Sequence, residues 1–139
     1  MHALYEMTGQ YGPLAGRILL AVIFVWSGVS KIGNFAGTAG FMAGAGIPFA
    51  GLALVVTIVI EIGGALMLIL GWQARLAAAA IFLWLIPVTL IFHAFWAVEA
   101  AQVQTQAIQF MKNLGIMGGM LYVMAFGAGP LSLDSRGKA

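Results

Sequence analysis

Four long apolar stretches dominate the sequence, and each is long enough to cross a lipid bilayer as a helix. They cover Leu14–Lys31, Ala50–Leu70, Leu76–Val98 and Ile108–Phe126. A helix needs about 20 apolar residues to cross the ~30 Å hydrocarbon layer, and its backbone hydrogen bonds must be satisfied within the segment. The sequence therefore predicts an all-α integral membrane protein built as a four-transmembrane-helix bundle.

The composition agrees with a chain surrounded by lipid. Of the 139 residues, 63% are hydrophobic and 7% are charged, whereas soluble domains carry roughly 25% charged residues. The formal net charge of +2 is too small for a nucleic-acid-binding surface, which needs clustered lysines and arginines. The chain has no cysteine and two histidines, which excludes thiolate catalysis and gives no metal-binding pattern. We therefore expect a lipid bilayer around the chain, no nucleic-acid partner, and no metal or thiol chemistry.

The connections between the stretches predict how the helices are joined. Residues 71–75 have the composition of a tight turn, and the glycine-rich loop 33–48 is expected to hold a short interfacial helix between helices one and two. Residues 100–109 are expected to extend helix four beyond the membrane. The predicted organisation is one four-helix membrane domain over residues 1–130, followed by a polar C-terminal tail over residues 131–139.

The basic residues predict the orientation in the membrane. Four spans put both termini on one side, and the side richer in lysine and arginine faces the cytoplasm. The terminal side carries Arg17, Arg75, Arg136 and Lys138, and the other side carries Lys31 and Lys112. We therefore expect the N-terminus and the C-terminus in the cytoplasm.

Glu61 is the clearest candidate functional residue, because it lies at the centre of the second stretch. A charge there costs at least ~2.5 kcal/mol if it faces lipid. Small and polar residues share its helical face, so that face is expected to point into the bundle. Four further polar residues lie toward the outer ends of the other stretches: Lys31, His93, Lys112 and Asn113. The spacing predicts an outward-opening polar cavity with a carboxylate at its floor.

These residue types suit proton-coupled redox at a membrane quinone or the binding of a small oxyanion, and they also suit purely structural contacts. Glu61 and His93 are the candidate catalytic residues, because a carboxylate and an imidazole can exchange protons near neutral pH. Lysine and asparagine supply hydrogen-bond donors, and indole rings can flank a flat ligand. The candidate ligand-binding residues are Lys31, Lys112, Asn113, Trp26 and Trp96.

The order of these features resembles the DoxX family of small bacterial membrane proteins. The matching segments span nearly the whole chain: Gly16–Arg17, Phe24–Ile32, Gly46–Pro48, Glu61–Gly64 with Gly71 and Arg75, His93, Phe110–Leu114 with Gly118–Gly119, and Gly129–Asp134. The resemblance implies a four-helix protein of the bacterial cytoplasmic (inner) membrane. The family takes its name from a subunit of a thiosulfate:quinone oxidoreductase, so the resemblance also implies a link to quinone redox systems.

The leading hypothesis is a small integral subunit of a membrane oxidoreductase system, with a quinone as candidate cofactor. Its expected partners are other redox subunits or further copies of the same chain. Two alternatives stay open: a non-catalytic membrane scaffold that anchors redox or stress-response partners, and a small solute carrier that acts as an oligomer.

Overall fold

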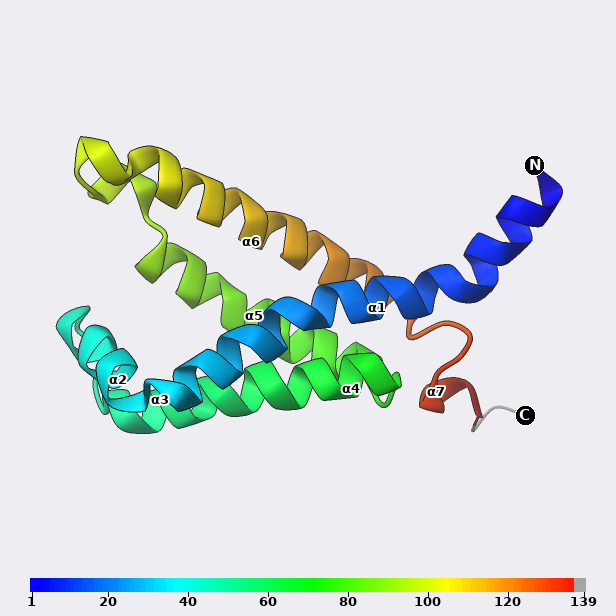
Figure 1. Cartoon of the computed structure of the whole chain (residues 1–139), viewed down its shortest axis with the longest axis horizontal. Helices are drawn as coiled ribbons and strands as arrows, with labels where there is room; N and C mark the ends of the chain where they lie inside the picture. Colours follow the sequence, from blue (N-terminus) through cyan, green and yellow to red (C-terminus); the bar gives the residue numbers. More distant parts are fainter. Residues whose placement is uncertain (137–139) are drawn as a thin grey trace.

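The computed structural model describes residues 1–136, which fold into helices joined by short connections, with no strand in that range (Figure 1). The helices are, in order, α1 (His2–Gly33), α2 (Phe35–Gly44), α3 (Ala50–Ile58), the π-helix η1 (Val59–Gly63), α4 (Gly64–Leu70), α5 (Ala74–Phe92), the 3-10 helix η2 (Phe95–Ala97), α6 (Ala100–Phe126) and α7 (Leu133–Arg136). Three helical stretches are long and apolar enough to cross a membrane: α1, Ala50–Leu70 and Ala74–Ala97. The prediction of an all-α membrane protein is confirmed. Lys138, which entered the charge count, lies outside the described residues.

Helix α1 starts twelve residues before the first apolar stretch, at His2. Pro13 lies inside it, and the helix bends near this position (Figure 1). Proline removes one backbone donor and its ring clashes with the preceding turn, which is the usual cause of a sharp helix bend. The part of α1 before Pro13 therefore projects away from the other helices.

The second apolar stretch is one continuous rod with a change of helix type in its middle. α3 passes into η1 and then into α4 without a break. A π turn inserts one extra residue into the helical ladder and rotates the side chains that follow it. Glu61 lies within η1, so the candidate acid occupies the widened turn.

The turn between α4 and α5 has a defined backbone cap. Gly71 has φ 64°, its N–H donates to Leu68 O, and the N–H of Trp72 donates to Met67 O. This is a Schellman ending, which requires a left-handed residue and therefore favours glycine. The predicted tight turn between the second and third spans is present.

Helix α5 is shorter than the predicted span. The sequence predicts a helix to Val98, but α5 ends at Phe92 and His93 adopts φ −125° and ψ 31°. An aromatic cluster takes over beyond this point, in which Phe95 and Trp96 pack edge-on against Phe110 of α6. The chain then turns and α6 begins at Ala100, as expected for a fourth helix that extends before its apolar part.

The helices pack closely at one end of the molecule. A Cβ atom on Gly64 would lie 2.9 Å from Ile81 Cδ1, and one on Gly119 would lie 2.9 Å from Leu20 Cδ2, so these glycines allow close approach. The core here is formed by small and aliphatic residues: Ala21, Leu68, Ala74, Ala77, Ala78, Ile81 and Met120. From this region α1 and α6 diverge toward α2 and η2 (Figure 1).

Candidate functional site

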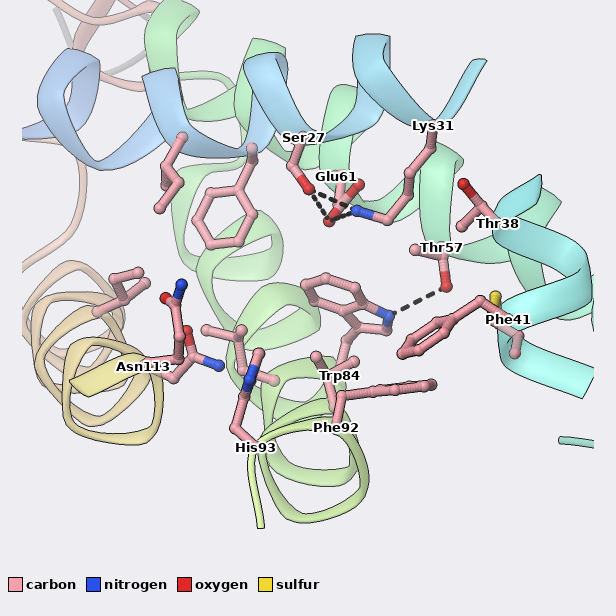
Figure 2. A pocket seen from close by; sticks show the side chains of 17 residues that line it. Ser27, Lys31, Thr38, Phe41, Thr57, Glu61, Trp84, Phe92, His93 and Asn113 are labelled. Carbon is pink, nitrogen blue, oxygen red and sulfur yellow. Dashed lines mark hydrogen bonds and ion pairs between the residues drawn. The ribbon is translucent and has the colours of Figure 1, made fainter. Parts of the chain in front are cut away.

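A buried ion pair joins α1 to the π turn. Lys31 Nζ lies 3.0 Å from Glu61 Oε1, and the Glu61 side chain is 2% exposed. Ser27 Oγ donates to the same carboxylate oxygen at 3.0 Å, and Lys31 Nζ also donates to Ser27 Oγ. Figure 2 shows both α1 side chains directed at Glu61. The predicted pairing of the acid with a polar residue of another span is therefore present in the structure.

Local sequence explains why these groups meet. Ser27 and Lys31 are one helical turn apart and so share a face of α1. Gly28 lies beside them, and a Cβ atom there would lie 2.5 Å from Ile62 Cγ1, so glycine lets α1 approach the π turn. Glu61 Oε2 is buried without a hydrogen-bond partner among the described residues, so the carboxylate is held through one oxygen.

The ion pair lines a cavity of about 350 Å³ between the diverging helices (Figure 2). Its walls come from α1, α2, α3 with η1, α5 and α6. Aromatic rings form much of the surface: Phe24, Phe41, Trp84 and Phe92. The cavity therefore combines one charged, internally neutralised wall with apolar faces that suit a flat ligand.

The wall opposite the ion pair carries His93 and Asn113. His93 Nδ1 lies 2.9 Å from Gln106 Oε1, and Asn113 Nδ2 donates to Thr89 Oγ1 at 2.9 Å. The structure thus brings four predicted site residues to one cavity, with Lys31 and Glu61 on one side and His93 and Asn113 on the other.

Three predicted ligand-binding residues lie outside the cavity. Lys112 is exposed, and so are Trp26 at 78% and Trp96 at 60%. Lys112 and Trp26 each neighbour a lining residue in sequence, and one residue turns the side chain about 100° around a helix. Trp96 follows His93 by three residues and would share its face in a continuous helix, but α5 ends at Phe92.

The sequence analysis missed the contributions of α2 and of Gln106. Thr38, Phe41 and Met42 of α2 line the cavity, although no charge or spacing marked them. Gln106 has a signal in the sequence, since it lies two helical turns before Asn113 and so on the same face of α6.

Arg17, counted in the sequence as an orientation signal, is buried at 2% exposure. Its guanidinium donates to Leu68 O at 2.9 Å, to Ile69 O at 3.1 Å and to Leu131 O at 2.9 Å. Arginine is suited to this because its fork carries several donors in fixed directions. Arg17 therefore ties the end of α4 to the segment after α6.

Comparison with known proteins places the chain in a family. The DoxX family model matches residues 12–94, which include Lys31, Glu61 and His93. This chain belongs to the DoxX family. Among its relatives, the Escherichia coli inner membrane protein YphA is 32% identical over 123 residues, covering 88% of each chain. The Escherichia coli inner membrane protein YqjF is 33% identical over 123 residues, covering 88% of this chain and 89% of the relative.

A more distant relative is longer than this DoxX chain. The Schizosaccharomyces pombe Surfeit locus protein 4 homolog is 28% identical over 130 residues, which cover 92% of this chain and 38% of that protein. No solved structure matches the chain. The matches to YphA and YqjF, together with the apolar helices, make this DoxX chain a membrane protein whose relatives are inner membrane proteins.

Proposed function

We propose that this DoxX protein binds a membrane quinone in the cavity between α1, α5 and α6, as an integral subunit of an oxidoreductase system. The observation that carries the proposal is the Lys31–Glu61 ion pair on the wall of an aromatic-lined cavity of about 350 Å³. Sites for small flat ligands are commonly 300–1,000 Å³, mostly apolar, with a few placed polar groups. In this proposal Lys31 and Asn113 hold the ligand, and Glu61 and His93 exchange protons with it.

The charges favour a neutral ligand over a small oxyanion. Lys31 is the one cationic side chain among the described cavity-lining residues, and Glu61 neutralises it at 3.0 Å. Lys112, the second predicted cation, is exposed outside the cavity. A bound anion would leave water for a site with no unpaired positive charge, which is unfavourable. A quinone carbonyl needs a hydrogen-bond donor and no net charge.

The proposal includes an opening of the cavity toward the lipid. Ile23 lines the cavity and is itself 43% exposed. A ligand dissolved in the bilayer can enter sideways by this route, whereas a water-soluble ion would have to cross apolar surface.

The membrane arrangement that goes with this proposal has four spans. α6 is 27 residues long, or about 40 Å at 1.5 Å per residue, which is sufficient to cross the bilayer and extend beyond it. α2 then lies at the membrane surface as the interfacial helix. The start of α1 and α7 lie at the same end of the molecule (Figure 1), and the proposal assigns that end to the cytoplasmic side. Other subunits supply the electron donor.

Filling the cavity tests the proposal without touching the ion pair. Val88→Trp places an indole in the space that Val88 lines, and Ile86→Trp places one on the exposed face of the same helix. We expect Val88→Trp to weaken binding of a short-tailed benzoquinone at least tenfold, measured by equilibrium titration of protein in lipid nanodiscs. Ile86→Trp is expected to bind as the wild type does. Equal binding by the wild type and the Val88→Trp variant would reject the cavity as the quinone site.

A further inference from the structure

Gln106 of α6 makes a hydrogen bond to the His93 ring that bears on which ring nitrogen carries the hydrogen. The Gln106 amide oxygen lies 2.9 Å from His93 Nδ1, and Gln106 is not one of the cavity-lining residues. An amide oxygen accepts hydrogen bonds and cannot donate them. With the amide oxygen facing the ring, the hydrogen of this bond is on Nδ1.

A neutral imidazole carries one N–H, so His93 with its hydrogen on Nδ1 has a lone pair on Nε2. His93 lines the cavity, and its Nε2 has no hydrogen-bond partner among residues 1–136. The atom that His93 leaves for a ligand is therefore an acceptor.

Asn113, on the same wall, also has one side-chain hydrogen bond within the protein. Its Nδ2 donates to Thr89 Oγ1 at 2.9 Å, and Asn113 also lines the cavity. Asn113 therefore offers the cavity its amide oxygen as an acceptor and its second N–H as a donor.

The opposite wall carries a donor. The Lys31 ammonium group has three hydrogens, and the structure uses two of them, toward Ser27 Oγ and Glu61 Oε1. The cavity therefore presents an N–H donor at Lys31 opposite an acceptor at His93.

We propose that Gln106 is a positioning residue that holds His93 in the Nδ1–H tautomer, so that the cavity prefers a ligand that presents a hydroxyl group to His93. This inference rests on the proposed function and sharpens it. A hydroquinone can donate to Nε2 and accept from Lys31, whereas the oxidised quinone can only accept. The site therefore favours the reduced form of the ligand, and Gln106 sets that preference without touching it.

The tautomer is measured directly by ¹⁵N NMR of histidine-labelled protein in nanodiscs. The chain has two histidines, so a His2→Gln background leaves a single signal from His93. We expect an Nδ1–H tautomer in that background, a shift to the Nε2–H tautomer in Gln106→Leu, and restoration in Gln106→Glu, which keeps an acceptor oxygen. Gln102→Leu, an exposed position one turn earlier on the same face, serves as the control and is expected to change nothing. An Nε2–H signal before any change at Gln106 would overturn the proposal.

The ligand preference is measured with a short-tailed benzoquinone and its hydroquinone. Leaving a buried acceptor unpaired costs about a tenfold loss in affinity, so the parent protein is expected to bind the hydroquinone about tenfold more tightly than the quinone. Gln106→Leu is expected to remove or reverse this ratio, and Gln102→Leu to keep it. A ratio that stays unchanged in Gln106→Leu contradicts the proposal. If no variant binds either form, the quinone proposal fails, and the NMR result alone decides the role of Gln106.

Discussion

At the scale of single residues, two opposite charges from separate helices form one buried ion pair. Lys31 and Glu61 neutralise one another at 3.0 Å, and Ser27 adds a hydrogen bond to the same carboxylate oxygen. Removing both charges of a buried pair is often tolerated, but removing one leaves the other unpaired in an apolar environment. Comparing a single variant with a double variant therefore distinguishes an ion pair that binds a ligand from one that only stabilises the fold.

The first prediction compares Lys31→Met with the double variant Lys31→Met/Glu61→Leu. The single change leaves Glu61 buried without its cation and is expected to lower the free energy of unfolding by about 3–5 kcal/mol. The double variant is expected to recover most of that loss, because no unpaired charge remains, while it still fails to bind quinone. Thermal unfolding in detergent and quinone titration measure the two effects. A double variant that binds quinone normally would show that the pair is structural.

The sequence identified the acid of this pair correctly, because a charged residue in mid-membrane is costly if it faces lipid and is therefore expected to face the bundle interior. The positions of Lys112, Trp26 and Trp96 were beyond its reach. A helical wheel shows which residues share a face, but not which face meets the partner helix. Lys112 is adjacent to Asn113 in the sequence, but its side chain lies outside the cavity that Asn113 lines. The sequence also gives no indication of the π turn around Glu61, since no residue pattern distinguishes it from ordinary helix.

At the scale of elements, the α4–α5 turn is held by hydrogen bonds with two side chains that are distant in sequence. Arg17 binds the last carbonyls of α4, and Asp134 accepts from the N–H groups of Gln73 and Ala74 at 2.7 and 2.9 Å. The N–H of Asp134 in turn donates to Gly71 O at 2.8 Å. The segment predicted as a polar tail therefore includes residues that cap two helix ends.

The second prediction concerns the glycine in this turn. Gly71 has φ 64°, and a Cβ atom there would collide with the Arg17 guanidinium and the Ser132 Cβ atom. Gly71→Ala is expected to cost at least about 1 kcal/mol, because the positive φ and the collision act together. Gly115→Ala, in a helix with open space around its Cβ position, is the matched control and is expected to be neutral or slightly stabilising. Melting temperatures in one detergent compare the two, and an equal effect of both changes would contradict this account of the turn.

The third prediction concerns the cap that Asp134 supplies to α5. Asp134→Ala removes both acceptors from the first turn of the helix and is expected to cost about 1 kcal/mol of stability. Glu6→Ala, which removes an exposed carboxylate paired with His2 near the start of α1, is expected to have little effect. Chemical unfolding measures the free energy of unfolding of the two variants. An unchanged value in Asp134→Ala would show that the cap is dispensable.

The ends of elements were the harder part to predict from the sequence. The apolar run from Leu76 continues to Val98, so hydrophobicity alone extends the third helix over both η2 and the aromatic cluster around Trp96. The structure ends that helix earlier because Phe95 and Trp96 pack sideways on Phe110. An apolar run looks the same in the sequence whether its side chains face lipid or pack on other aromatic rings. The tertiary contacts therefore decide where the helix ends.

At the scale of the whole molecule, the closely packed core and the cavity lie toward opposite ends. Glycines and alanines bring the helices together near the α4–α5 turn, and the same helices diverge toward α2, where the cavity lies (Figure 1). The closely packed end fixes the angles between the helices.

The fourth prediction tests the orientation of this arrangement. The chain has no cysteine, so single cysteines can be introduced without background. Ser135→Cys lies in α7, and Thr105→Cys lies in α6 near η2. In intact spheroplasts a membrane-impermeant maleimide is expected to label Thr105→Cys and to reach Ser135→Cys only after lysis. The reverse pattern would place the termini outside the cytoplasm.

The most direct test of the central claim is photolabelling with an azidoquinone in nanodiscs, followed by peptide mapping. The account predicts label on cavity residues such as Trp84 and Phe92, its displacement by unlabelled quinone, and its loss in Val88→Trp. Label confined to lipid-facing residues such as Trp26, with no displacement, would contradict a quinone site inside the bundle.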